Sequence, residues 1–172
     1  MSNQRIRSSI EAATNYLTEH PDEARYTDSV ATAALVDGLH IRVKGPGGET
    51  LTTDMPTSVG GGGQSPSPGW VFRAALASCE ATVIAMRAGV EGVELHTLEV
   101  AVESESDDRG ILGMDEATPA GPLSIRVRIR IEGPGTPADR LRAIAEWGTR
   151  HCPVDDVARR AVPMNVEIET GP

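Results

Sequence analysis

Helical periodicity marks the first part of the chain. Residues 3–19 place apolar side chains three or four positions apart, the spacing of an amphipathic helix; these are Ile6, Ile10, Ala13 and Leu17. The helix is expected to end before Pro21, because proline disfavours a helical conformation at the preceding residue. We interpret residues 1–27 as a helical extension and residues 28–172 as the main domain.

Between residues 28 and 55 the helical spacing is replaced by an alternation of apolar and polar residues, interrupted by turn signals. A turn is indicated at Asp37-Gly38, and a second one at the glycine-rich residues 45–48. The pattern predicts a meander of about three strands. A flexible glycine-rich connection, TSVGGGGQSPSP, then leads to Pro68, which is a favourable first residue for a helix.

The segment from residue 68 to 88 predicts a long helix with apolar residues on most of its faces. Such a helix is typical of the centre of a domain. Small residues along it let a neighbouring helix or sheet approach closely; they are Ala74, Ala75, Ala77, Ser78 and Ala81.

Two strands with one buried face each are predicted next, at residues 98–102 and 123–131. A long loop at residues 105–122 joins them, and loops of this length are often functional. The second strand turns three arginines outward, and the first strand carries glutamates on its polar face. We interpret the arginines as partners in cross-strand ion pairs and not as a nucleic-acid-binding patch.

A helix at residues 136–151, a short helix after the residues HCPV, and a closing strand complete the pattern. The closing strand would carry its apolar side chains on one face, namely Val162, Met164, Val166 and Ile168. Helices and strands in this order predict an α+β domain with antiparallel sheets around a long central helix.

Composition narrows the possible functions. The chain of 172 residues has a formal net charge of −9, which argues against a nucleic-acid-binding or anionic-membrane-binding surface. No segment resembles a signal peptide, and none approaches the roughly 18 apolar residues of a membrane span. We therefore expect a cytoplasmic protein with reduced thiols.

Cys79 and Cys152 are the only cysteines, and four histidines accompany them. Neither CxxC nor HxxxH spacing occurs, so we expect no metal site, and nothing in the sequence indicates a cofactor. The residues by themselves leave two interpretations open. The cysteines are a redox pair, or they are two small residues of the core.

The run DMPTSVGGGGQSPSPGWVFRAALASC, followed far downstream by CPV, resembles the OsmC-like family, which includes the organic hydroperoxide resistance proteins. In that family a glycine-rich, proline-containing loop opens a central helix that bears the first cysteine. The second cysteine belongs to a Cys-Pro motif near the start of a later helix. The resemblance extends over about residues 28–169 and implies an OsmC-like fold and an intertwined homodimer.

The resemblance also implies a thiol-dependent peroxidase. Cys79 would be the peroxidatic residue, whose thiolate attacks the O–O bond of a hydroperoxide substrate and becomes a sulfenic acid. Cys152 would be the resolving thiol that closes a disulfide with Cys79. An external dithiol, with a lipoyl group as one family precedent, would reduce the disulfide.

Two positions depart from the family pattern. Peroxidase members carry a glutamate ten residues before the first cysteine, where this chain has Gly69, and an arginine at the position that aligns with Val36. Other cations are candidates for the missing arginine, and the supporting residues that we name are Arg73, Arg109 and His151. Glu80 directly follows Cys79 and points about 100° away from it on the helix, which argues against a direct partnership.

Two alternatives to the peroxidase therefore stand beside it. In one, the fold is kept without peroxidase activity, and a pocket near Cys79 binds a small apolar ligand. In the other, the chain forms a non-catalytic dimeric protein whose two cysteines are inert. Native thiol reactivity separates these alternatives from the peroxidase, because a functional cysteine reacts fast at neutral pH.

Overall fold

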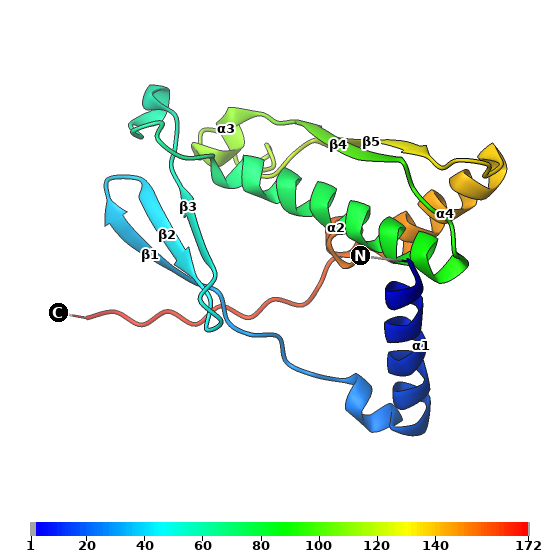
Figure 1. The fold of residues 1–172 in the computed structure, drawn as a ribbon. Coiled ribbons are helices and arrows are strands. Elements are labelled where there is room, and N and C mark those ends of the chain that lie inside the picture. Colours follow the sequence, from blue (N-terminus) through cyan, green and yellow to red (C-terminus); the bar gives the residue numbers. More distant parts are fainter. Residues whose placement is uncertain (1–2, 172) are drawn as a thin grey trace.

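The fold is an α+β arrangement, seen in a computed structural model that describes residues 3–171 (Figure 1). Five helices and five strands follow each other along the chain, with two short 3₁₀ helices. Their bounds are α1 Asn3–Glu19, η1 Pro21–Ala24, β1 Thr32–Asp37, β2 His40–Lys44, β3 Thr50–Thr53, η2 Thr57–Val59, α2 Pro68–Glu91, β4 Thr97–Glu105, α3 Asp108–Ile111, β5 Ser124–Glu132, α4 Ala138–Arg150 and α5 Pro153–Arg159. The predicted antiparallel strands and long central helix are confirmed.

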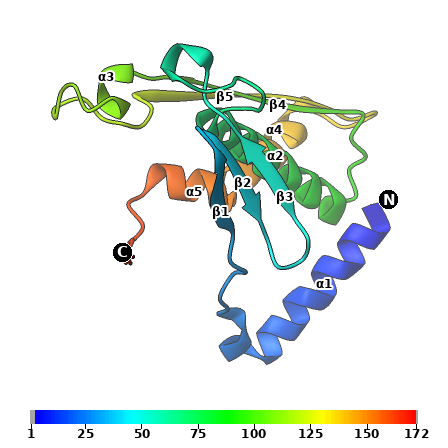
Figure 2. The same cartoon turned by 90° about the vertical axis from the view of Figure 1, so that its left-hand side faces the viewer.

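Two antiparallel sheets form, and they lie apart from each other (Figure 2). The first has the order β1-β2-β3, with the predicted turn between Asp37 and His40. The second consists of β4 and β5 and runs along one side of α2. The second sheet and α4 belong to the same core as α2, whereas the first sheet is largely exposed.

The arginines of β5 form the cross-strand ion pairs that the sequence predicts. The register places Glu103 opposite Arg126 and Glu99 opposite Arg130. Arg128 donates to Glu103 over 2.7 Å, and Arg130 lies 3.6 Å from Glu99. These pairs are exposed to solvent, so they contribute little to stability, and their main consequence is to fix the register of the two strands.

The core lies between α2, α4 and the second sheet. Ile84 and Ile144 are fully buried at its centre, and Leu98 and Ile129 pack against them from the strands. Gly148 brings α4 close to α2, because a Cβ atom at this position would collide with the side chain and backbone of Ile84. This close crossing holds the end of α4, and with it the start of α5, against the middle of α2.

In the single chain, α2 is buried along one face only. The buried residues follow a spacing of four, at Leu76, Glu80, Ile84 and Ala88, while Trp70 on another face is 52% exposed. By length and composition, α2 would suffice to cross a membrane, so the sequence-based statement that no segment approaches such a span was wrong. Its contacts with α1, α4, α5 and β4 are those of a central helix in a packed domain.

The N-terminal helix α1 begins at the C-terminal end of α2 and extends away from the body of the protein (Figure 1). Asn3 and Arg7 donate hydrogen bonds of 2.8 Å to the carbonyl oxygens of Val93 and Val90. Ile6 packs so closely on Gly89 that a Cβ atom there would collide with it. Helix α1 is therefore attached through its first two turns.

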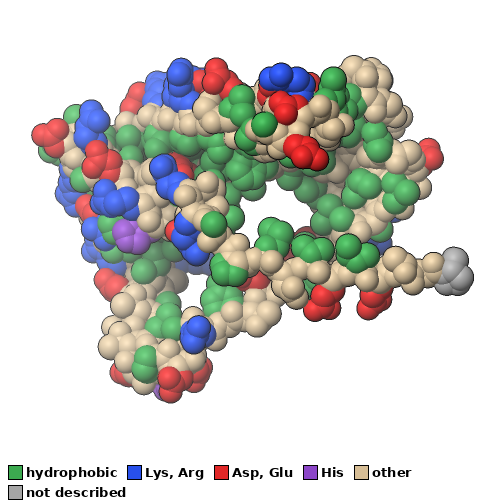
Figure 3. Space-filling model, turned by 180° about the vertical axis from the view of Figure 1, so that it is seen from behind, with side chains coloured by type: hydrophobic (Ala, Val, Ile, Leu, Met, Phe, Trp, Pro, Cys, Tyr) green, Lys and Arg blue, Asp and Glu red, His purple; other side chains and the backbone are tan. Residues whose placement is uncertain are grey.

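The predicted closing strand is wrong for the single chain, because residues 161–171 follow an irregular, extended path. Met164 is 87% and Ile168 82% exposed. Figure 3 shows the apolar side chains of this segment on the side of a hollow and the acidic side chains on the opposite side. The alternation is that of a strand, but within residues 3–171 this segment pairs with no other strand.

Candidate active site

The loop that leads into α2 is organised by a buried carboxylate. Asp54 accepts hydrogen bonds from the backbone N–H groups of Met55, Gly62 and Gln64, at 2.7, 3.2 and 3.2 Å. The hydrogen bond from Gln64, followed by those of the other two amides, lowers the pKa of Asp54. Gly61 is required because a Cβ atom would collide with the Met55 carbonyl. The loop predicted to be flexible is thus folded around Asp54.

Cys79 lies in the middle of α2 and is partly exposed. The start of this helix is fixed by Ser67, whose side-chain oxygen accepts the N–H of Trp70 over 3.2 Å, and by Pro68 in the first turn. The Ser67 cap and Pro68 fix the residue at which the helix begins, so local sequence sets the position of Cys79 relative to the loop.

Cys152 is the N-cap residue of α5 and is only 1% exposed. Its Sγ atom accepts the backbone N–H of Asp155 over 3.4 Å, and Pro153 follows as the first helical residue. The Cys-Pro pair therefore begins a helix, as the sequence predicts, and it does so against the middle of α2.

The environment of Cys152 favours the thiol over the thiolate. Burial, with a smaller contribution from the side chain of Cys79, raises the pKa of Cys152 to about 11, against the opposing effect of the Asp155 N–H. An amide at a helix start favours a thiolate, but at Cys152 desolvation outweighs this effect. The contribution of Cys79 to this shift indicates that the two cysteines lie near each other, where α5 packs against α2.

A prediction for thiol chemistry follows from this raised pKa. In the reduced protein at pH 7.5, iodoacetamide should alkylate Cys152 about a hundredfold more slowly than an unperturbed thiol, because the thiolate fraction is smaller by that factor. The rate should rise with each pH unit towards about pH 11. Peptide mapping of quenched samples measures it, with urea-unfolded protein as control. A rate that levels off below pH 9 contradicts the raised pKa.

The three supporting residues named from the sequence make their polar contacts away from the cysteines. Arg73 donates to the hydroxyl of Ser104 over 3.3 Å, and Arg109 binds the carboxylate of Asp107 in the loop after β4. His151 stacks on Trp147, with ring centroids 3.9 Å apart, at the end of α4. Of the three, His151 is the direct sequence neighbour of Cys152, yet its side chain is exposed.

The two positions that depart from the family pattern are visible in the fold. Gly69 lies in the first turn of α2, and a Cβ atom there would lie 3.9 Å from Nη1 of Arg73. Val36 lies on β1, and 48% of it is exposed. An arginine guanidinium therefore lies beside the position where family peroxidases have a carboxylate.

Glu80 is the residue whose position the sequence analysis did not foresee. It is fully buried, its Oε2 lies 3.4 Å from the hydroxyl of Thr149, and its Oε1 has no hydrogen-bond partner within residues 3–171. Burial, and then the negative charge of Asp155, raise the pKa of Glu80. A sequence signal existed, because Glu80 lies four residues from both Leu76 and Ile84 in the buried stripe of α2.

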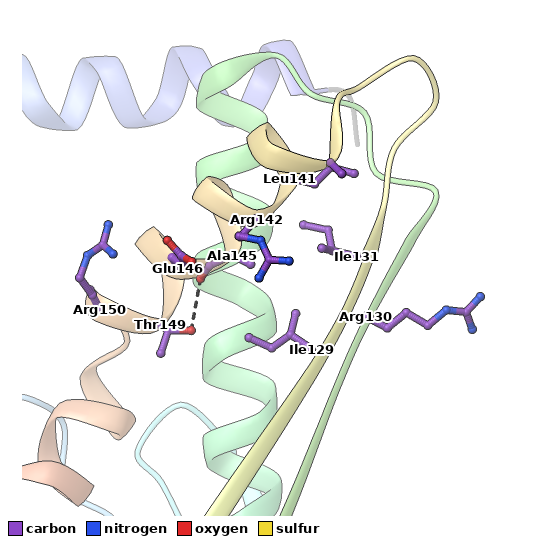
Figure 4. Close-up of a pocket in the computed structure, with 10 residues that line it drawn as sticks. Ile129, Arg130, Ile131, Leu141, Arg142, Ala145, Glu146, Thr149 and Arg150 are labelled. Carbon is purple, nitrogen blue, oxygen red and sulfur yellow. Dashed lines mark hydrogen bonds between the residues drawn. The ribbon is translucent and has the colours of Figure 1, made fainter.

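A cavity with a volume of about 680 Å³ lies elsewhere, between α4 and β5. Figure 4 shows Ile129, Ile131 and Leu141 pointing into it, with Arg142 at the side of α4 and Arg130 directed away. Neither cysteine lines it. Within residues 3–171, moreover, no three His, Cys, Asp or Glu side chains gather in a way that would hold a metal ion.

Comparison with protein families gives one match, which covers most of the chain. The model of the family described as OsmC-like protein matches residues 61–167, which include α2, the second sheet and both cysteines. The helical extension and the first sheet precede the matched residues. No curated protein matches the chain by sequence.

Several solved structures share the fold at low sequence identity. An organic hydroperoxide resistance protein OsmC from Legionella pneumophila is 22% identical, with a TM-score of 0.57 over 78% of this chain and 91% of that one. An OsmC-like protein from Mycoplasma pneumoniae is 15% identical, with a TM-score of 0.63 over 78% and 89%. An OsmC-like protein of unknown function from Vibrio cholerae is 12% identical, with a TM-score of 0.64 over 77% and 94%.

Proposed function

The chain belongs to the OsmC-like protein family, and on that premise we propose that it reduces organic hydroperoxides through Cys79 and Cys152. One observation supports this proposal above the others. Two cysteines that are far apart in the sequence come near each other, one partly exposed and one buried. The partly exposed thiol of Cys79 is accessible to a substrate, as a peroxidatic cysteine must be. The buried thiol of Cys152 is suited to react afterwards, as a resolving cysteine does.

The reaction runs in three balanced steps. The thiolate of Cys79 attacks the terminal oxygen of the hydroperoxide, the O–O bond breaks, and the alkoxide takes up a proton to leave as an alcohol. The thiol of Cys152 then condenses with the sulfenic acid of Cys79 and releases water. An external dithiol then transfers two hydrogens to the disulfide. Both cysteines return to thiols, and the dithiol becomes a disulfide. We place this cycle in a reducing cytoplasm, where such dithiols are kept reduced.

The test is a titration of the fully reduced protein with cumene hydroperoxide, followed by intact mass. The wild-type chain should lose two hydrogens at about one equivalent of peroxide, because the two thiols become one disulfide. Non-reducing peptide mapping should then identify the bond between Cys79 and Cys152. A chain that keeps its reduced mass under many equivalents would refute the proposal.

The substitutions at positions 69 and 36 favour a second candidate function. Without the family's glutamate and arginine, the same fold would bind a small apolar ligand or serve as a non-catalytic dimeric protein. The buried Glu80 and the cavity that it lines are the observation in favour of ligand binding. An unchanged mass in the peroxide titration would select this candidate.

We also propose a homodimer. Apolar side chains are exposed on the first sheet and on the C-terminal segment, among them Leu35, at 69%, and Met164, at 87%. The C-terminal segment has the alternation of a strand (Figure 3), and none of the strands described between residues 3 and 171 pairs with it. A second copy would cover both surfaces and supply that partner.

The expected result for assembly is a solution mass of twice 18.2 kDa. Changing Met164 and Ile168 together to aspartate should yield monomers, because burying unpaired charges in an interface is strongly unfavourable. Asn165→Asp is the matched control, since Asn165 alternates with the two apolar residues, and it should remain dimeric. Light scattering after size-exclusion chromatography measures all three. A monomeric wild type would contradict the proposal.

A further inference from the structure

A second cavity adjoins the buried face of α2, next to the one in Figure 4, with which it shares Ile129 and Thr149. Its volume is about 490 Å³, within the range of small-molecule sites. Leu76 and Glu80 of α2 line it on one side, and β5 lines it with apolar side chains such as Ile125 and Val127. Thr149 and the helix α5 complete the lining. The cavity is thus apolar along β5 and polar near Glu80.

The polar part of the cavity contains an acceptor without a donor. Oε1 of Glu80 is buried and has no hydrogen-bond partner within residues 3–171. Leaving a buried oxygen unpaired is costly, so such atoms are normally satisfied by protein, water or ligand. Glu80 lines the cavity but is fully buried, so a molecule inside the cavity can supply the missing donor once the carboxyl group rotates towards it.

The hydrogen bonds of the Thr149 hydroxyl indicate whether the Glu80 carboxyl group is protonated. The single hydroxyl proton of Thr149 has two acceptors within reach, the Ala145 carbonyl at 3.2 Å and Oε2 of Glu80 at 3.4 Å (Figure 4 draws the first). If the proton goes to Ala145, the hydroxyl oxygen is free to accept a proton carried by Oε2. The raised pKa of Glu80 favours this neutral acid, whose Oε1 is then a carbonyl acceptor.

The other charged groups of the cavity compensate each other. Asp155 and Arg159 both line it, and they form an ion pair through Oδ2 and Nε. With Glu80 neutral, the cavity has no net formal charge. An ion would enter it without a partner of opposite charge, whereas an uncharged molecule would not face this cost.

We propose that this cavity binds an uncharged aliphatic molecule with a single O–H donor, of the size of a medium-chain alcohol, whose hydroxyl donates to Oε1 of Glu80. The alkyl chain lies along Ile125, Val127 and Leu76. The site involves neither cysteine, so the proposal does not depend on the peroxidase function, and it specifies the ligand class for the second candidate function.

The experiment compares two isomeric probes, 1-octanol and 1-methoxyheptane, on the reduced full-length protein. They have the same atoms, but only the alcohol has a donor. We expect 1-octanol to bind about five- to tenfold more tightly, the effect of one hydrogen bond to a buried acceptor. Methyl NMR shifts of Leu76, Ile125 and Val127 report the affinity and the location.

Variants of Glu80 separate the hydrogen bond from general apolar binding. Glu80→Leu should bind both probes equally, and it removes a buried polar atom, which leaves folding intact. Glu80→Gln keeps a neutral carbonyl acceptor and should keep the preference for the alcohol. Glu146→Leu makes the same chemical change at an exposed position of α4 and should behave as the wild type.

Three results would overturn the proposal. One is a wild type that binds neither probe, as when water or a second copy fills the cavity. Another is equal binding of both probes by the wild type. The third is a preference for the alcohol that survives in Glu80→Leu. A loss of preference in Glu80→Gln would refute the neutral carboxylic acid. Peroxide reduction is measured separately and leaves these outcomes unchanged.

Discussion

Replacing Cys79 with serine is expected to lower the rate of hydroperoxide reduction by roughly three orders of magnitude or more. The reason is chemical, because a serine hydroxyl at neutral pH is neither a thiolate nor able to form a sulfenic acid. The variant should remain folded, since Cys79 is partly exposed and serine is of similar size. Peroxide consumption with excess dithiothreitol measures the rate.

Cys152→Ser is the matched variant, and it separates the two roles. It should still gain one oxygen atom on Cys79 with the first equivalent of cumene hydroperoxide, because the first step needs only the peroxidatic thiol. The mass should not show the loss of two hydrogens, since Cys79 has no thiol to condense with. If Cys79→Ser reduces peroxide as fast as the wild type, or if oxygen adds in Cys79→Ser alone, the assigned roles are wrong.

The second large effect concerns stability. Ile84→Ala should lower the free energy of unfolding by about 2–5 kcal/mol, because Ile84 is fully buried and the residues around it cannot fill the void. Ile84 also contacts Gly148 where α4 crosses α2. Loosening this crossing should let α5 move away from α2 and slow the formation of the disulfide.

Urea unfolding at one fixed protein concentration measures the change, since an oligomer's stability depends on concentration. Leu17→Ala provides the control. It removes a large aliphatic side chain at a position of α1 that is 42% exposed, and it should cost less than about 1 kcal/mol. Equal losses in both variants would mean that the crossing of α2 and α4 is not the centre of the core.

Much of the fold follows from local signals. The helix at residues 3–19 matches α1 to the residue, and the strand predicted at residues 123–131 appears as β5, one position later. Pro68 and Pro153 both begin helices, because a proline in the first turn costs no hydrogen bond. The arginines of β5 pair with the glutamates of β4, because residues on one face of neighbouring strands lie opposite each other.

Other features depend on contacts between distant segments, and local patterns did not predict them. The apolar alternation of residues 162–168 is that of a strand, yet a strand needs a sheet edge to pair with, and no strand in the described part of the chain pairs with this segment. Similarly, Leu123 continues the apolar alternation of β5 but is 56% exposed. A pattern states which face prefers burial, and packing decides whether something covers it.

The candidate site shows the same difference between features set by local sequence and features set by tertiary contacts. Local sequence is enough to place one cysteine on the central helix and the other before a helix-starting proline, because helix starts and periodicity are local properties. The burial of Cys152 near Cys79, and of Glu80 as an acid at a cavity, comes from the packing of distant segments. Burial and desolvation arise where α2, α4, α5 and β5 meet, and no window of neighbouring residues contains that information.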